Sequence, residues 1–317
     1  MTEKIIINKT ITNKTKTIVT AVKNLPGIIE NKVLAPLTSY GIGGPAVFYL
    51  EAKNEKDLIR AAVAAKECGL PFFVLGGGSN ILVSDKGFRG LVVRTKNSGI
   101  AVNKIGQGKT ITVGSGTRLS DLAGYFLENS LVGMEWAAGI PGTVGGAIRG
   151  NAGAMSGSMA DVVSQVNFFD VNGLAAGTRS FPKKECFFSY RDSIFKNKIN
   201  LVIVSCGIAG KKGKAGDIKK KMGECLAKKL KSQPYDLPSA GSIFKNPKDM
   251  FAAKLIDECG LKGRKIGGAI ISDKHANFII NAGGATSSDV KKLIALAKKE
   301  VFKKFNVKLE EEIEIVG

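Results

Sequence analysis

The 317-residue sequence has few of the side chains that metal sites and disulfide frameworks need. Its single histidine, His275, has no cluster of Cys or His around it, which disfavours a zinc site. The five cysteines stand singly along the chain, at Cys68, Cys186, Cys206, Cys225 and Cys259. Because they are odd in number and form no C-x-x-C pair, we expect reduced thiols rather than disulfides. The sequence therefore predicts no metal, and a chemistry that uses an organic cofactor or none.

Long apolar runs are absent as well, since none approaches the roughly 20 residues that span a bilayer. The segment Met1–Ile7 lacks the apolar stretch and the small-residue cleavage site of a signal peptide. We therefore expect a cytoplasmic globular protein with no membrane partner. The length leaves room for two or three domains.

Acidic residues are scarce relative to basic ones, 27 against 47, so the formal net charge is +20. Nine lysines fall between Lys211 and Lys231, around an apolar stripe at helical spacing. The stripe is formed by Ile218, Met222, Cys225, Leu226 and Leu230. This pattern is typical of a helix with solvated lysines. Because the run lacks interleaved aromatic residues and any nucleic-acid motif, we expect no nucleic-acid partner, and the charge suits a nucleotide-linked substrate equally well.

Glycine, in contrast, is abundant at 39 residues, and two stretches concentrate it. Residues 133–154 are GMEWAAGIPGTVGGAIRGNAGA, with seven glycines, and Leu75–Asn80 contains three consecutive glycines between two apolar strands. Glycine is retained at such density where the backbone turns with positive φ or approaches another group closely. Successive main-chain N–H groups then form a nest for an anion such as a diphosphate. The two loops suggest one extended ligand, although each alone is also consistent with a tight turn.

Neither loop contains a standard nucleotide-binding motif. The one Walker-like string, Gly106–Thr110, has Asn103 where the first glycine belongs. It continues into alternating Ile111 and Val113 rather than a helix, so we interpret it as a hairpin turn.

Periodicity outlines strands and helices around these loops. A strand at 46–51 precedes a helix that Asn54 caps, and a strand at 72–75 leads into the first loop. We further expect a helix around 119–126, strands at 110–113, 166–171 and 201–206, and a linker at 207–217. After a helix at 249–260 and a strand at 276–281, the last helix opens with a capping box at Thr286–Asp289. A final strand is expected at 307–316.

Three polar segments are candidates for chemistry. Arg191 lies among aromatic residues and is either an ion-pair partner of Asp192 or a clamp for a carboxylate or phosphate. Ser242 lies in a proline-flanked segment and is by itself more typical of a turn than of a hydrolase nucleophile. The acidic tail Leu309–Ile315 is most simply a solvated strand face.

Taken together, these segments resemble the UDP-N-acetylenolpyruvoylglucosamine reductases (MurB), flavoenzymes of peptidoglycan precursor synthesis. The matching pieces occur in the family's order over nearly the whole chain. They are TSYGIGGPA (38–46), VLGGGSNILVSDKGFRG (74–90), AAGIPGTVGGAIRGNAGA (137–154), YRDSIFK (190–196), PSAGSIFKNP (238–247), KHANFIIN (274–281) and LEEEIEIVG (309–317). The PSAGS form, and the absence of a long tyrosine-bearing insertion after the Arg191 segment, resemble the shorter type of the family.

The resemblance implies an α+β (mixed α/β) fold, with a PCMH-type FAD-binding region of two α/β subdomains and a smaller α/β substrate-binding domain. The cofactor region would span residues 1–210, with subdomains of about 1–95 and 96–210, and the substrate domain would span 218–306. The C-terminal strand 307–317 would lie near the active site.

The resemblance also implies roles for residues at matching positions. Arg191 would lie near the substrate carboxylate, Ser242 would donate a proton, and Glu312 would be the acidic active-site residue. Tyr190 and Asn246 would contact the substrate. The residues that would bind FAD are Gly76, Gly77, Gly78, Ser79, Asn80, Gly139, Ile140, Pro141, Gly142, Thr143, Gly145, Gly146, Ala147, Asn151 and Gly153.

The implied activity is NADPH-dependent, FAD-mediated reduction of UDP-N-acetylglucosamine enolpyruvate to UDP-N-acetylmuramate, by a monomeric or weakly associating enzyme. Two positions depart from the family pattern: Gly41 replaces a basic or bulky residue, and Glu314 replaces an arginine. Because several glutamates are adjacent in the tail, the assignment of Glu312 depends on the Leu-Glu-x-Glu register. The alternatives are another PCMH-type flavin oxidase or dehydrogenase acting on an alcohol or sugar, and a basic nucleic-acid-binding protein.

Overall fold

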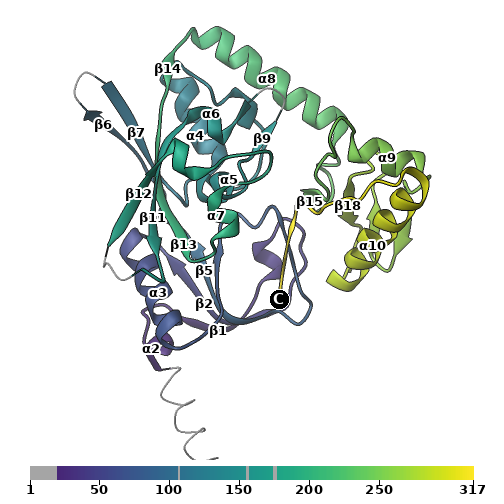
Figure 1. The fold of residues 1–317 in the computed structure, drawn as a ribbon, viewed down its shortest axis with the longest axis horizontal. Helices are drawn as coiled ribbons and strands as arrows, with labels where there is room; N and C mark the ends of the chain where they lie inside the picture. Colours follow the sequence, from purple (N-terminus) through teal and green to yellow (C-terminus); the bar gives the residue numbers. More distant parts are fainter. Residues whose placement is uncertain (1–19, 106–107, 155–156, 174–176) are drawn as a thin grey trace, which may run out of the picture.

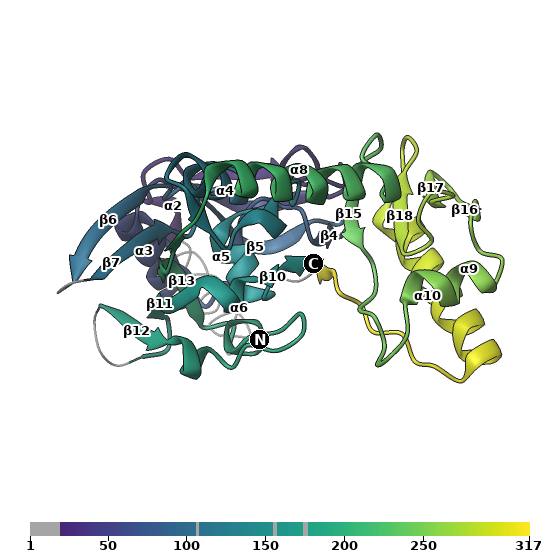
Figure 2. The same ribbon diagram turned by 90° about the horizontal axis from the view of Figure 1, so that it is seen from above.

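The computed structural model describes residues 20–105, 108–154, 157–173 and 177–317. Its ribbon is a larger body and a smaller lobe of C-terminal elements, from which the end of the chain returns to the body (Figure 1). Seen from above, helix α8 (Ala215–Ser232) lies along the body and reaches toward the lobe (Figure 2). The predicted mixture of helices and strands is confirmed. The first part of the predicted cofactor region, residues 1–19, lies outside the described residues.

The first sheet of the body carries the first glycine loop. Its strand order is β1-β2-β5-β3, in which β2 and β3 run parallel to β5 and β1 runs antiparallel to β2. The elements of this part are α2 (Thr20–Lys23), β1 (Ile29–Val33), η1 (Ala35–Leu37), β2 (Pro45–Ala52), α3 (Glu55–Glu67), β3 (Phe72–Leu75), β4 (Ile81–Val83) and β5 (Phe88–Thr95). The predicted cap of α3 is confirmed, because the Asn54 side chain accepts a hydrogen bond from the Asp57 N–H. The glycine loop follows directly from the end of β3.

The second sheet is entirely antiparallel, in the order β12-β11-β13-β7-β6. Its strands are β6 (Ile100–Ile105), β7 (Gly108–Gly114), β11 (Val163–Asp170), β12 (Thr178–Pro182) and β13 (Leu201–Ile208). The pairing of β6 with β7 confirms the predicted hairpin, whose tip at 106–107 lies outside the described residues.

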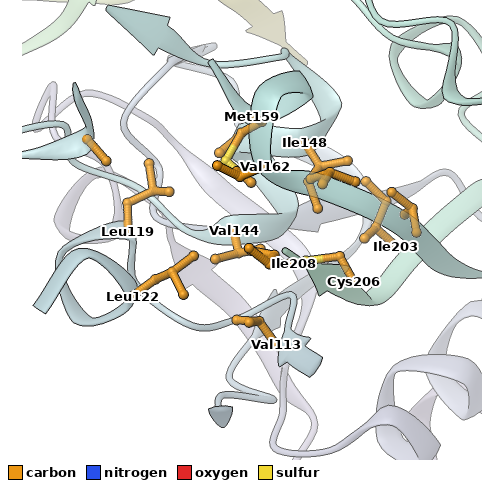
Figure 3. Close-up of a cluster of buried hydrophobic side chains, with 14 of the residues drawn as sticks. Val113, Leu119, Leu122, Val144, Ile148, Met159, Val162, Ile203, Cys206 and Ile208 are labelled. Atoms are coloured by element: carbon orange, nitrogen blue, oxygen red, sulfur yellow. The ribbon is translucent and has the colours of Figure 1, made fainter. Parts of the chain in front are cut away.

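Short elements cover this sheet and carry the second glycine loop. They are α4 (Leu119–Glu128), β8 (Leu131–Val132), η2 (Glu135–Ala137), α5 (Val144–Arg149), β9 (Gly153–Ala154), β10 (Gly157–Ser158), α6 (Met159–Val162), η3 (Lys183–Cys186), α7 (Ile194–Asn197) and β14 (Lys211–Lys212). Figure 3 shows the apolar core between them, where Val113 of β7, Leu122 of α4 and Val144 of α5 meet Met159 and Cys206. This core holds α5, and with it the second glycine loop, against the sheet.

The C-terminal lobe is built on a four-stranded antiparallel sheet of order β15-β18-β17-β16. Its elements are β15 (Ser239–Ser242), α9 (Ala252–Glu258), β16 (Lys265–Ile266), β17 (Ala269–Ile271), β18 (Phe278–Asn281) and α10 (Ser287–Phe305). The predicted capping box of Thr286 and Asp289 is confirmed at the start of α10. The Asp85 carboxylate of the body accepts hydrogen bonds from the N–H groups of Ser287 and Ser288, which ties this end of α10 to the body.

Two predictions from periodicity are wrong in part. The final strand is shorter than 307–316, because β19 covers only Glu314–Val316, the part of the tail that pairs in parallel with β4. In α8, Ile218 is buried as expected, but Leu226 and Leu230 are 39% and 49% exposed while Lys229 is 6% exposed. The helix packs against η2 and α4, and this packing turns Lys229 inward.

The glycine-rich stretch and the predicted linker also contain structure that the sequence did not indicate. Residues 144–149 form helix α5 within the second loop, and Lys211–Lys212 form strand β14 beside β8. No helix in the described part of the chain is both long and apolar enough to cross a membrane.

Candidate active site

A cavity of about 300 Å³ brings both glycine loops together with the acidic tail. The predicted site residues that line it are Gly76, Gly77, Gly78, Ser79, Asn80, Ile140, Pro141, Gly142, Thr143, Gly146, Ala147, Gly153, Arg191, Ser242 and Glu312. Gly139, Gly145, Asn151, Tyr190 and Asn246 do not line it. A second depression, of about 520 Å³, lies along β1, β2 and α3 and contains none of the predicted site residues.

The two loops approach each other so closely that only glycine fits between them. A Cβ on Gly77 would lie 2.7 Å from the Cα of Gly142, which is closer than two non-bonded carbon atoms can approach. Gly142 has φ +125°, a conformation that residues with side chains rarely adopt. The Ser79 hydroxyl donates a hydrogen bond to the Pro141 carbonyl at 3.1 Å and fixes one loop to the other. The dense glycine pattern therefore reflects a main-chain contact between two loops that face one cavity.

Several polar atoms of the two glycine loops lack a hydrogen-bond partner among the described residues. Within the described residues, the Thr143 Oγ1 atom is buried and makes no hydrogen bond. The main-chain N–H groups of Gly77 and Gly78 likewise donate to no acceptor in that part of the chain. A buried hydroxyl such as that of Thr143 is costly unless a ligand satisfies it. An uncharged set of N–H and hydroxyl donors suits the oxygens of a diphosphate, so the residues present fit the diphosphate of a dinucleotide.

Arg191 lies at the tip of a tight turn. The main chains of Ser189 and Asp192 exchange two hydrogen bonds around it, and Arg191 adopts φ +56°. Its Nε atom lies 2.6 Å from Oε1 of Glu312. The Asp192 carboxylate instead accepts from the Ser193 N–H, so the predicted alternative of an ion pair between Arg191 and Asp192 is not formed. A non-glycine residue in this strained conformation, with its charge aimed into a cavity, is typical of a functional site.

Glu312 is held in place by the main chain of its tail segment. Its N–H donates to the Ile243 carbonyl at 2.7 Å, and the Asn80 side chain donates to its carbonyl at 3.2 Å. Burial raises the pKa of the Glu312 carboxyl above its usual value, against the opposite effect of the neighbouring Arg191 charge. Burial therefore favours the protonated form of Glu312 more than the Arg191 charge favours the carboxylate, relative to a free glutamate.

Ser242 ends strand β15, opposite Phe278 of β18. The preceding Gly241 has φ +78°, and the pairing of the two strands is irregular at this point. Ser242 lines the cavity, and its hydroxyl makes no hydrogen bond to any described residue. It is thus a proton donor without a competing acceptor in the described chain.

The five predicted site residues outside the cavity lining have other contacts. Asn151 supports the Arg191 turn, since its side chain donates to the Ser189 carbonyl. Gly145 donates its N–H to the Ser115 carbonyl, and the Gly139 carbonyl accepts from the Tyr235 hydroxyl.

Tyr190 and Asn246 lie together across the boundary between body and lobe. The Asn246 N–H donates to the Tyr190 hydroxyl oxygen at 3.3 Å, and the Arg191 guanidinium lies 5.5 Å from the Tyr190 ring centre. Tyr190 is therefore a neighbour of Arg191, and Asn246 contacts Tyr190, although neither residue lines the cavity itself.

Four charged residues of the cavity were missed as site residues from the sequence. Arg149 pairs with Glu314 at 3.0 Å, so the unusual Glu314 has a partner from the second glycine loop. Lys196 lies in the YRDSIFK segment next to Arg191, a position that could have drawn attention to it, and burial together with the nearby Lys245 charge lowers its pKa. The fourth, Lys229, gives no signal among the surrounding lysines.

Comparison with known proteins gives consistent matches along the chain. Residues 46–176 match the family model of an FAD binding domain, and residues 233–316 match that of the UDP-N-acetylenolpyruvoylglucosamine reductase C-terminal domain. A UDP-N-acetylenolpyruvoylglucosamine reductase of Caldanaerobacter subterraneus subsp. tengcongensis is 43% identical over 90% of this chain and 93% of its own length. One of Carboxydothermus hydrogenoformans is 43% identical over 92% of this chain and 94% of its own.

A solved structure gives the same result in three dimensions. The crystal structure of UDP-N-acetylenolpyruvylglucosamine reductase (MurB) from Thermus caldophilus superimposes with a TM-score of 0.75 at 33% sequence identity. The similarity covers 91% of this chain and 98% of that one. The likeness therefore includes the body, the lobe and the tail.

Proposed function

The chain belongs to the UDP-N-acetylenolpyruvoylglucosamine reductase family, and we propose that Arg191, Ser242 and Glu312 are the residues with which it acts on its substrate. The protein is an FAD-dependent oxidoreductase of peptidoglycan synthesis that reduces UDP-N-acetylglucosamine enolpyruvate, with NADPH as the electron donor. Its fold is α+β, with an FAD-binding region of the PCMH type. The observation that carries the residue proposal is that the three side chains, from distant segments, line one cavity with both glycine loops.

The glycine loops are the proposed FAD site. The N–H groups of Gly77 and Gly78 and the hydroxyl of Thr143 would hold the diphosphate, because these donors have no partner within the described chain. When bound, FAD supplies a two-electron carrier that accepts a hydride from NADPH and delivers one to the terminal CH₂ carbon of the enolpyruvyl group.

Arg191 and Glu312 are proposed to stabilise the charge that this hydride creates on the substrate. The electron pair of the double bond moves to the adjacent carbon and spreads onto the carboxylate. A guanidinium fixed by a tight turn, and an acid whose pKa burial raises, are preorganised donors for that charge. The contact between the Arg191 Nε atom and the Glu312 carboxyl group holds both groups in position before the substrate arrives.

Ser242 is proposed to deliver the proton that completes the reduction. Its hydroxyl faces the cavity without a partner in the described residues, so it is free to donate to the carbanionic carbon. An alcohol is a weak acid, but it is sufficient toward a strongly basic carbon at hydrogen-bond distance. Overall, NADPH is oxidised, the double bond is reduced, and one hydride and one proton are added.

Tyr190 and Asn246 are proposed to bind the remainder of the substrate. Their mutual hydrogen bond joins the Arg191 turn to the segment after Ser242. Residues 1–210 are proposed as the cofactor region and 218–306 as the substrate domain, with the tail returning to the cavity. A cytoplasmic location and a monomeric or weakly associating state stay predictions.

The test is an anaerobic two-step experiment. The purified protein is reduced with NADPH, UDP-N-acetylglucosamine enolpyruvate is added, and the flavin absorbance is followed. We expect the oxidised flavin spectrum to return only after the enolpyruvyl sugar is added. In a parallel run with air admitted, rapid reoxidation by oxygen without that sugar would favour a flavin oxidase instead. A colourless protein with salt-sensitive nucleic-acid affinity would contradict the cofactor assignment.

A further inference from the structure

Lys229 stands apart from the other lysines of α8. Lys228 and Lys231 are exposed, whereas Lys229 is only 6% exposed. Its Nζ atom donates to the carbonyls of Trp136 at 3.0 Å and Ala138 at 2.6 Å. A lysine is rarely buried without a specific partner, and here the partners are the main chain just before the second glycine loop.

The turn after α8 reinforces the same attachment. The Tyr235 hydroxyl donates to the Gly139 carbonyl at 2.9 Å, so Trp136, Ala138 and Gly139 all have their carbonyls held by this part of the chain. A Cβ on Gly139 would lie 2.8 Å from the Leu226 side chain, which shows how closely α8 lies against the loop. The segment Trp136–Gly139 leads directly into Ile140–Thr143 of the proposed FAD site.

The hydrogen bonds of Lys229 leave one donor unused. An ammonium group has three N–H donors, and two of them are taken by the carbonyls. Within the described residues, no carboxylate forms an ion pair with Lys229. The side chain lines the same cavity as Gly142 and Thr143. A buried cation that has no ion-pair partner, and that lies beside main-chain donors suited to a phosphate, is a site for an anion.

We propose that Lys229 binds the diphosphate of FAD with its third N–H and thereby positions the second glycine loop against the cofactor. This inference rests on the proposed function only in taking FAD as the bound cofactor. NADPH and the UDP-sugar also carry a diphosphate, but the contacts of Lys229 favour FAD because they are made to the main chain that leads directly into the second glycine loop. Lys229 is thus a cofactor-positioning residue, distinct from the side chains that face the substrate.

Because Lys229 is titratable, the affinity for FAD should depend on pH. Burial lowers its pKa to about 8, and Cys225 on the same helix acts in the opposite direction. The titratable groups on the elements packed against α8 are Glu135 of η2 and Asp121, Tyr125 and Glu128 of α4, with Tyr235 following the helix. An anion bound to the ammonium raises its pKa, so FAD binding takes up a proton wherever the free lysine is partly neutral.

The direction of the effect follows from this linkage. Below a pH of about 8 the free ammonium is already charged, and the dissociation constant of FAD stays constant with respect to this group. Above that pH the constant rises, by up to about tenfold per pH unit while the bound form remains protonated. The free energy of unfolding of the protein without FAD should increase over the same range. As pH rises from about 8 toward the pKa of the lysine in the unfolded chain, the folded protein no longer has to bury the charge.

The experiment measures FAD release from the holoenzyme. Holoenzyme is diluted stepwise, and the dissociation constant is obtained from the rise in flavin fluorescence between pH 6.5 and 10. The variants are Lys229→Met and Lys229→Arg, with Lys228→Met as the control because it removes an exposed lysine from the adjacent position. We expect Lys229→Met to weaken FAD binding by about ten- to a hundredfold at pH 7, the effect of one charge-assisted hydrogen bond, and Lys228→Met to change it less than about twofold.

Two further measurements separate a diphosphate contact from a purely structural role. Lys229→Arg stays charged, so it should retain FAD at pH 7 while losing the rise in dissociation constant that wild type shows above pH 8. Riboflavin lacks the diphosphate, so its affinity should be equal in wild type and Lys229→Met.

Three results would overturn the proposal. They are an equal loss for riboflavin and FAD, a pH dependence that persists in Lys229→Arg, and an increase in the KM for NADPH without any loss of FAD. A wild type that contains no flavin would instead contradict the cofactor assignment and hence the proposed function.

Discussion

The two walls of the cavity present different kinds of chemical group. The cofactor wall, formed by Gly76–Asn80 and Ile140–Ala147, uses main-chain donors and the Thr143 hydroxyl, and Lys229 is the charged group beside it. The reaction wall, formed by Arg191, Ser242 and Glu312, uses side chains from three distant segments. Main-chain donors depend on the local course of the backbone, whereas the three side chains depend on how the whole chain folds.

This difference has a physical cause in what each wall must do. A bound diphosphate keeps its charge throughout catalysis, so donors that do not change during the reaction, backbone N–H groups and the Lys229 ammonium, hold it. The substrate gains charge and a proton during the reaction, which requires groups that ionise or donate. The comparison predicts that changes on the reaction wall affect turnover, while changes on the cofactor wall affect FAD affinity.

Ser242→Ala should give the largest effect, because it removes the proposed proton donor and leaves the cofactor wall untouched. Reduction of the flavin by NADPH should remain normal, whereas reoxidation by the enolpyruvyl sugar should slow by about 10³-fold or more, within the range of general acid catalysis. Stopped-flow absorbance separates the two steps. Ser239→Ala, in the same strand but outside the cavity, is the control. Normal reoxidation in the Ser242 variant would exclude Ser242 from the mechanism.

Arg191→Met should be the next most severe change. It removes a preorganised donor and leaves Glu312 buried without its cation, so we expect turnover to fall by about 10²- to 10³-fold with FAD affinity nearly unchanged. Steady-state kinetics and FAD release report the two quantities. The exposed Arg179, replaced by Met, serves as the control for loss of one surface charge. A variant that loses FAD but keeps its turnover would contradict the assignment of Arg191 to the reaction wall.

The parts of the molecule that depend on local requirements could be predicted from the sequence. The caps at Asn54 and Thr286 follow from side-chain hydrogen bonds within one turn. The clustering of glycines signalled close main-chain contacts, and Gly77 meets Gly142 in this way. Periodicity likewise located the main helices and strands near the two loops.

The parts that depend on tertiary packing could not be predicted from periodicity. Lys229 lies on a helix whose pattern indicated solvated lysines, yet packing against η2 buries it. The tail had the alternation of a longer strand, but only Glu314–Val316 has a partner strand. The meeting of Arg191 with Glu312 had no signal in spacing, and only the family resemblance brought both residues into one site.

Glu312→Gln tests whether the acid of the reaction wall acts in its protonated form. The amide still donates a hydrogen bond but does not ionise, so we expect a loss of about ten- to a hundredfold, smaller than for Arg191→Met. Wild-type turnover should fall as pH rises through the raised pKa of Glu312, and this limb should be missing in the variant. The pH profile of kcat, measured for both proteins, gives the comparison.

The stability of the two proteins checks the same assignment independently. Because the folded-state pKa of Glu312 is raised, the stability associated with this group is present at low pH and lost as pH rises through that pKa. The melting temperature of wild type should therefore decline relative to Glu312→Gln over that interval. Parallel melting curves at every pH would contradict a raised pKa.

Gly77→Ala should have the smallest effect on turnover and should act on the cofactor wall alone. The added Cβ would lie 2.7 Å from the Cα of Gly142, so one loop must move away from the other and the donors for the diphosphate separate. We expect FAD binding to weaken by about tenfold, with normal turnover once FAD is saturating. Gly124→Ala is the control, because a Cβ there meets nothing and the residue lies within α4. Flavin fluorescence on dilution measures the affinity, and reduced turnover at saturating FAD would mean that the two walls are coupled rather than separate.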